Sequence, residues 1–379
     1  MRILHTSDWH LGKSLGARPL DEDQRFALQQ VRDHLRDEAY DLVVVAGDVF
    51  DRATPSEDAV QMLGGWLGEV RAHRPTLPIV IIAGNHDNGP RLAWTSTLLD
   101  HQHVYLRGST ERIDAPIRIR GQSGVEAQVW AVPYLLPGAM GEASPSQMAA
   151  MQAAIGRIDA RQDRGMAQIL VAHCFVANGL TSDSERSLIG TATQLDPEEF
   201  AGFDYVALGH LHRPQSVAMN ARYSGSIARY SFSEAGHGKA MLDVTVTPGA
   251  PHACVSRPLD TLRPMKRITA TLEALRDDPA YAPDLDAYVE LTLEPPVDRG
   301  NPLDTLRKRW RHILSFRNEL VGAGLALARV QNTGDDGPRD LAADFVEFDQ
   351  QFTATDAPNE AVLSAFQELL ARLPEEEKA

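Results

Sequence analysis

The sequence predicts a layered α/β fold followed by a small α+β domain and a helical tail. Short β-branched runs have the length of buried strands and occur at residues 42–46, 79–83, 169–172 and 205–208. Stretches with the helical period lie between these runs. Alternation of strands and helices is typical of a sheet whose faces are covered by helices.

The helical stretches are recognised by apolar residues that recur on one face. Leu28, Val31 and Leu35 share such a face. A second face is shared by Val60, Leu63, Leu67 and Val70. Further on, residues 266–272 and 287–293 alternate apolar and polar positions like half-buried strands, and residues 303–310 read as a short basic helix.

The last 45 residues predict a pair of amphipathic helices after an acidic linker. Leu341, Phe345 and Phe348 recur at helical spacing. A second apolar stripe follows Pro358 and consists of Val362, Leu363, Phe366, Leu369, Leu370 and Leu373. Two apolar faces without a further domain to cover them indicate a surface for a partner, although they could also pack on the preceding domain.

Length and charge divide the chain into three parts. Its 379 residues carry 37 basic and 52 acidic side chains, a net charge of −15. Residues 335–379 have a net charge of −9, whereas residues 299–317 have a net charge of +5. With Pro258 and Pro264 framing one boundary and residues 334–338 reading as a linker, we expect domains at 1–263, 264–334 and 335–379.

Composition excludes several classes of protein. The acidic balance excludes a strongly basic nucleic-acid binder, although not a nuclease that handles phosphates with metal ions. No apolar run approaches the roughly 20 residues that span a bilayer, and the N-terminus lacks a secretory pattern. The two cysteines, Cys174 and Cys254, exclude a disulfide framework and favour a cytoplasmic location without a membrane role.

Most of the predicted strands end in residues that bind metals. These residues are Asp8, His10, Asp48, Asn85, His86, His173, His210 and His212. Each alone is an ordinary turn or core residue. Because catalytic groups gather at the carboxyl ends of parallel strands, we expect all of them to meet at one edge of one sheet.

These motifs resemble the signature of the calcineurin-like metallophosphoesterases. The order is Asp-x-His, Gly-Asp-x-x-Asp, Gly-Asn-His-Asp, His and Gly-His-x-His. Residues 1–12, 46–51, 207–215 and 231–234 are similar to the SbcD family, the nuclease subunits of bacterial SbcCD complexes. The resemblance implies a β-sandwich flanked by helices, with a small capping domain at residues 264–334.

The resemblance also implies two divalent metal ions. One would be held by Asp8, His10, Asp48 and His212, and the other by Asp48, Asn85, His173 and His210, with Asp48 bridging. Two such ions activate a water and clamp the oxygens of an in-line displacement. Mixed oxygen and imidazole ligands suit Mn²⁺, Fe²⁺ or Zn²⁺ better than Mg²⁺, and the family favours Mn²⁺.

Four further residues are candidates for catalysis or substrate binding. In the family, the histidine at His86 stabilises the transition state or protonates the leaving oxygen, and Asp51 would orient it. An N-terminal helix cap is the alternative for Asp51. Arg52 and Lys13 could each contact a substrate phosphate, or lie on the surface as solvated cations.

The resemblance implies a DNA phosphodiesterase that acts in repair, recombination and replication. Such a subunit works as an ATP-stimulated 3′–5′ double-strand exonuclease and a single-strand and hairpin endonuclease. Its partner is an SbcC-like ATPase with a coiled coil, bound by the helices of residues 335–379, and two nuclease subunits form a homodimer within a heterotetramer. The alternatives are a small-substrate phosphatase or cyclic-nucleotide phosphodiesterase on the same fold, and a scaffold without activity.

Overall fold

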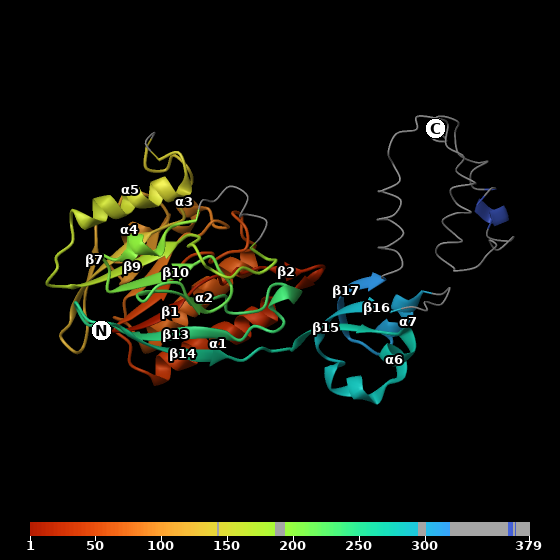
Figure 1. The fold of residues 1–379 in the computed structure, drawn as a ribbon. Coiled ribbons are helices and arrows are strands. Elements are labelled where there is room, and N and C mark those ends of the chain that lie inside the picture. The colour runs from red at the N-terminus through yellow and green to blue at the C-terminus, as the bar shows by residue number, and fades with distance from the viewer. Residues whose placement is uncertain (142–143, 186–193, 295–300, 319–362, 367, 369–379) are drawn as a thin grey trace, which may run out of the picture. The chain divides into compact units, whose positions relative to one another are not determined.

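The computed structural model describes residues 1–141, 144–185, 194–294, 301–318, 363–366 and 368. The chain divides into two units, Met1–Met265 and Lys266–Ala379 (Figure 1). The sequence analysis placed this boundary two residues earlier. The first helix expected in the tail lies outside the described residues. Residues 363–366 are helical and belong to the second one.

The first unit is built on two six-stranded sheets (Figure 1). In order across it, the first sheet contains β14 (Ala253–Leu259), β13 (Lys239–Thr245), β1 (Arg2–Thr6), β4 (Leu42–Val45), β5 (Ile79–Ile82) and β6 (Val104–Arg107). The second contains β11 (Gln215–Ser216), β12 (Ala221–Tyr223), β10 (Tyr205–Gly209), β9 (Ala167–His173), β8 (Glu126–Val132) and β7 (Ile117–Arg120). Strands β1, β4, β5 and β6 run parallel to one another, as do β8, β9, β10 and β12.

Helices cover the outer face of each sheet. On the first sheet, α1 (Asp21–Asp37) and α2 (Glu57–His73) bury apolar side chains against β4 and β5. On the second sheet, α5 (Gln147–Asp159) buries its apolar side chains against β8, β9 and β10, and it lies above that sheet in Figure 1. Helix α2 begins where the Ser56 side chain accepts a hydrogen bond from the Ala59 amide, 3.3 Å away.

The remaining elements of this unit are short. They are β2 (Ser14–Leu15), β3 (Arg18–Pro19), α3 (Gly89–Leu92), α4 (Ser96–Asp100) and the 3₁₀ helices η2 (Pro197–Phe200) and η3 (Phe232–Glu234). They lie in the connections between the main strands and helices. The unit is therefore a four-layered sandwich of helices, sheet, sheet and helix, which confirms the predicted α/β fold with helices on the sheets.

Two expectations for this unit were wrong. The strands form two sheets and not one, and apolar side chains such as Val44, Val80 and Val171 pack between the two. Both faces of central strands such as β4 and β9 are buried, so the pattern of these strands does not reveal which strands are their neighbours. On α2, Val60 is 50% exposed, and the buried stripe runs instead through Ala59, Met62, Leu63, Trp66 and Val70.

The second unit contains a three-stranded sheet with its own apolar core. Its elements are β15 (Met265–Ala270), α6 (Leu272–Asp277), the 3₁₀ helix η4 (Pro279–Asp284), β16 (Tyr288–Leu293), α7 (Pro302–Arg307) and β17 (His312–Asn318). Leu275, Leu306 and Trp310 pack against the β16 side chains. The basic segment ends in strand β17, which the sequence analysis did not predict.

Within the described ranges, no helix is long and apolar enough to cross a membrane.

Candidate metal centre

The seven ligand-type residues all lie at or just after the carboxyl ends of parallel strands. Asp8 and His10 follow β1, Asp48 follows β4, and Asn85 follows β5 in the first sheet. The other three come from the second sheet, where His173 ends β9 and both His210 and His212 follow β10. The site therefore lies where the edges of the two sheets meet, and not at the edge of a single sheet.

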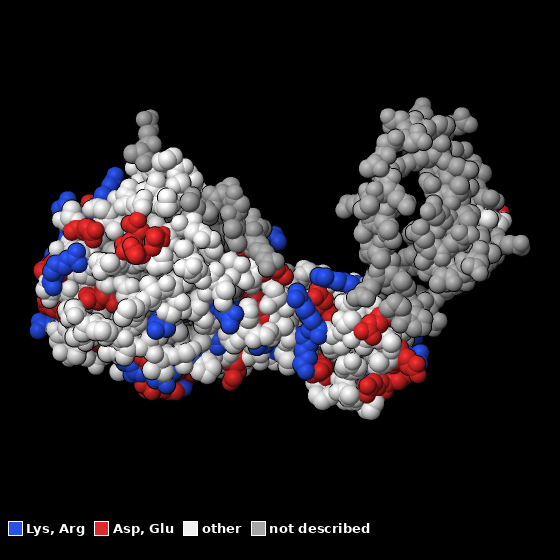
Figure 2. Space-filling view, viewed as in Figure 1, with Lys and Arg blue, Asp and Glu red and all other residues white. Residues whose placement is uncertain are grey.

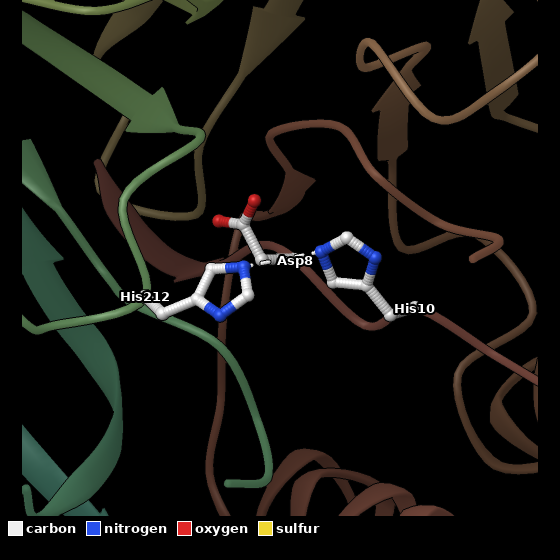
Figure 3. A group of neighbouring side chains, drawn as sticks. All are labelled: Asp8, His10 and His212. Carbon is white, nitrogen blue, oxygen red and sulfur yellow. Dashed lines mark hydrogen bonds between the residues drawn. The ribbon is translucent and has the colours of Figure 1, made fainter. Parts of the chain in front are cut away.

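Short distances connect these side chains into one cluster. His10 Nε2 lies 3.2 Å from His212 Nε2, and Asp8 completes their group (Figure 3). Asp48 Oδ2 lies 3.5 Å from Nε2 of both His10 and His173. On the other side, Asn85 Oδ1 is 3.0 Å from His173 Nε2 and 3.0 Å from His210 Nδ1. Asp48 thus lies in the middle of the cluster, which is the place that a bridging ligand needs.

The backbone is strained at four of these seven residues. Asp8, His10 and Asp48 have φ angles of 51°, 45° and 47°, and His210 has a φ of 113°. Left-handed backbone at residues other than glycine costs roughly 1–3 kcal/mol each and clusters at functional sites. Surrounding hydrogen bonds hold the strained turns. The Asp8 carboxylate accepts from the His210 amide at 3.0 Å, and the Asp48 carboxylate accepts from the His86 amide at 2.8 Å.

Burial governs the charges of the cluster. Burial raises the pKa of Asp8 to about 6. It lowers the pKa of His10 to about 4 and that of His210 to about 3, so both rings are neutral at pH 7. Burial also acts to raise the pKa of Asp48, but the neighbouring His173 holds the pKa of this carboxyl well below its usual range. The centre therefore combines ionised carboxylates with two neutral rings, whereas the Asp48 carboxylate outweighs the effect of burial on His173 and raises the pKa of that ring to about 9.

This donor set fits divalent metal ions. His173 Nδ1 donates to the Ala46 carbonyl at 2.8 Å, and His212 Nδ1 donates to the Glu234 carboxylate at 3.1 Å. Both rings therefore have Nε2 on the side of the cluster, and each offers the lone pair of that atom to an ion once the ring is neutral. Among the described residues, three overlapping groups have the spacing of a metal site: Asp8, His10 and His212; Asp8, Asp48 and His173; and His10, Asp48 and His86. Imidazole nitrogen with carboxylate oxygen suits Mn²⁺, Fe²⁺ or Zn²⁺.

His86 lies beside the cluster and is the more accessible group. Its side chain is 26% exposed, and its ring stacks edge-on against His10 with 4.6 Å between centroids. We expected the Asp51 carboxylate to orient it. Instead, the Asp51 carbonyl oxygen accepts from His86 Nδ1 at 2.9 Å, while the carboxylate is 4.0 Å from that atom.

The Asp51 carboxylate faces other groups. It lies 2.6 Å from Lys13 Nζ and 3.4 Å from His10 Nδ1. Lys13 is therefore an ion-pair partner with a side chain only 17% exposed, and not a free cation. The neighbouring Arg52 is 80% exposed, with its Nε 4.0 Å from Asp51, and so remains able to meet a substrate phosphate.

The sequence analysis missed residues that fix the ligand turns. Asp87 accepts hydrogen bonds from the amides of Val49, Phe50 and Gly84, which ties the turns after β4 and β5 together. The fully buried Gln24 of α1 does the same for the first turn, since it donates to the His10 carbonyl at 2.6 Å. The Gly-Asn-His-Asp motif contained the signal for Asp87, whereas nothing in the helical pattern of α1 distinguishes Gln24.

Comparison with known proteins places this site in a family. The model of the calcineurin-like phosphoesterases matches residues 1–214 of the chain, which include all seven ligand-type residues and His86. Among solved structures, the chain is similar to a dimetal phosphatase from Danio rerio. The sequences are 11% identical, the match covers 68% of this chain and 96% of that one, and the TM-score is 0.40.

Proposed function

The chain belongs to the calcineurin-like phosphoesterase family, and from this premise we propose that it is a two-metal nuclease of the SbcD type. Membership of the family makes it a metal-dependent phosphoester hydrolase. The proposal adds that the ester is a phosphodiester of DNA, cut as a 3′–5′ double-strand exonuclease and a hairpin endonuclease, and that the ions are Mn²⁺.

The observation that carries the proposal is the second unit with its exposed cations. The family match ends at residue 214, and a separate unit begins at Lys266. There, Arg307, Arg311 and Arg317 have side chains that are 62%, 74% and 65% exposed. A hydrolase of small molecules has no need of such a unit, whereas Lys and Arg contacts to phosphates dominate affinity for DNA.

The chain's own groups divide the work of hydrolysis. When bound, two divalent ions lower the pKa of a water and offset the charge of the phosphoryl oxygens. Asp48 and the surrounding ligands hold that position rigid. His86 keeps Nδ1–H on the Asp51 carbonyl, so its Nε2 is free to carry a proton to the leaving oxygen. General acid catalysis of this kind contributes about 10²–10⁴-fold.

Cleavage of a labelled DNA hairpin by the full chain in Mn²⁺ tests the proposal. We expect His86→Asn to abolish cleavage and His73→Asn, a change of an exposed histidine on α2, to leave it intact. A nitrophenyl phosphodiester is measured beside the DNA. Hydrolysis of this diester without any DNA cleavage, even with an ATPase partner present, would refute the nuclease.

That result would favour a small-substrate phosphatase or cyclic-nucleotide phosphodiesterase. One observation supports this alternative, since all seven ligand-type residues and His86 lie within the first unit, Met1–Met265. A site that is complete in one unit can serve a small substrate. The hairpin and the small diester therefore separate the two functions in a single experiment.

We further propose that the partner is an SbcC-like ATPase and that the subunit works as a homodimer in a heterotetramer. The partner proposal depends on the apolar stripe that includes Leu363 and Phe366. Changing both to aspartate should abolish stimulation by ATP and the ATPase subunit. Hydrolysis of the small diester should stay unchanged, because neither residue belongs to the unit that holds the site.

A further inference from the structure

A buried ion pair lies directly behind the metal-ligand residue His212. Glu234 comes from η3, and Lys239 is the first residue of β13. Glu234 Oε2 and Lys239 Nζ are 2.5 Å apart, and both side chains are 0% exposed. Both residues lie beyond residue 214, where the family match ends.

Glu234 determines which nitrogen of His212 faces the centre. Glu234 Oε1 lies 3.1 Å from His212 Nδ1 and also accepts a hydrogen bond from Ser184 Oγ at 2.7 Å. An ionised carboxylate only accepts hydrogen bonds, so the proton of His212 is on Nδ1. The lone pair of Nε2 then points toward His10, 3.2 Å away.

Lys239 holds the same histidine by a second route. Besides Glu234, its ammonium group donates to the His212 carbonyl oxygen at 2.9 Å and to Ser226 Oγ at 2.7 Å. All three of its protons are therefore used. The lysine fixes both the backbone of the ligand and the carboxylate that orients the ligand's ring.

Among the described residues, no such pair lies behind the other metal position. His173 Nδ1 donates to a backbone carbonyl, that of Ala46, at 2.8 Å. A carboxylate partner makes a ligating imidazole more basic than a neutral carbonyl does, and loss of such a partner typically lowers metal affinity about 10–100-fold. A buried ion pair is also a poor device for stability, because desolvation offsets its attraction.

We propose that Glu234 and Lys239 are positioning residues for His212 and set the affinity of one metal position, that of Asp8, His10 and His212. The position of His173, Asn85 and His210 does not depend on them. The inference rests on the metal centre of the proposed function, but it concerns binding of the ion and not cleavage of any substrate.

Calorimetric titration of the metal-free full chain with Mn²⁺ tests the inference, with free Mn²⁺ counted by electron paramagnetic resonance. We expect wild type to bind two ions. Glu234→Gln keeps the shape of the side chain but removes its charge, and it should weaken one binding step about 10–100-fold while the other stays unchanged. Glu234→Asp, which keeps the charge, should weaken the same step less, and this variant serves if the glutamine variant folds poorly.

Lys239→Met separates positioning from charge. If the lysine acted only as a charge, its removal would strengthen the binding of a cation. Because it holds His212 and Glu234 in place, we expect the same step to weaken as in Glu234→Gln. Tighter binding would overturn the proposal.

Asp243→Asn is the matched control. It removes the charge of another carboxylate on β13, one that is 6% exposed and paired with Arg2, but it touches no ligand. Both binding steps should remain as in wild type. The inference would be overturned if Glu234→Gln weakened both binding steps equally, or if it weakened neither step. A wild-type chain that binds no Mn²⁺ would instead refute the metal centre itself.

Discussion

Replacing Gly84 with alanine would place a methyl group against the Asp48 carboxylate. A Cβ built on Gly84 would lie 2.1 Å from Asp48 Oδ1 and 2.3 Å from the Asp48 amide nitrogen. Ordinary van der Waals contact begins at 3.4 Å, so the carboxylate must move by about 1.3 Å. The Asp48 backbone is already strained, with a φ of 47°, and has little freedom to give way.

This displacement gives the size of the expected loss. A misplacement of about 1 Å in a catalytic site can cost roughly 10²-fold in rate. Overpacking adds about 1–3 kcal/mol of destabilisation. We therefore expect Gly84→Ala to lower kcat/KM for a nitrophenyl phosphodiester in Mn²⁺ by about 100-fold. Thermal unfolding should show that most of the chain remains folded at the assay temperature.

Gly64→Ala is the matched control. Gly64 lies inside α2, and a Cβ there meets nothing within 4 Å. Alanine in a helix interior is more stable than glycine by roughly 0.5–1 kcal/mol, so this variant should unfold at a higher temperature with full activity. Activity of Gly84→Ala equal to that of Gly64→Ala would refute the placement of Asp48 at the centre of the site.

Three further changes test other parts of the first unit. The hydrogen bonds from Arg2 lower the pKa of Asp243 to about 2, so the charge of this carboxylate stabilises the fold above pH 4, and this stability is lost as the pH falls toward 2. We expect Asp243→Asn to lower the free energy of unfolding by about 2 kcal/mol at pH 7 and by almost nothing near pH 2, as measured by chemical unfolding at several pH values. Gln24→Ala leaves the buried His10 carbonyl and the partly buried Gly12 amide without their partner. It should lower the free energy of unfolding by about 2–3 kcal/mol and reduce diester hydrolysis as well. Trp94 and Leu98 are 81% and 71% exposed, so if the proposed homodimer uses this surface, changing both to serine should halve the mass measured by light scattering, and an unchanged mass would exclude it.

The strand pattern was enough to predict the layered fold and to predict that the polar side chains at the ends of the strands lie together. Runs such as 42–46 and 79–83 are β-branched and end at turns with Gly and Asp or Asn, and these local signals survive in the structure as β4 and β5. The pattern could not assign strands to sheets. Side chains on both faces of β4 and β9 are buried, so neither strand carries a polar face that distinguishes its neighbours.

The roles of individual polar groups were harder to predict. The sequence analysis placed Asp51 near His86. In the structure the Asp51 carboxylate binds Lys13 and only its backbone carbonyl binds His86, because of a backbone turn that the pattern does not encode. Glu234 and Lys239 are five residues apart in the sequence, yet both contact His212 only because η3 and β13 bring them there. Contacts of this kind depend on tertiary packing, which local propensity does not determine.

Polar bridges between the two sheets explain how ligands from both reach one point. Apolar packing between the sheets is not directional and does not by itself fix their register. His5 on β1 lies 2.8 Å from the Tyr205 hydroxyl and 3.1 Å from the Leu208 carbonyl, both on β10. His173 donates across to the Ala46 carbonyl, and these buried bonds are costly if they are not made. The sheets are therefore aligned by bonds that belong to the chain itself, and the same bonds bring the ligand-type residues of both sheets together.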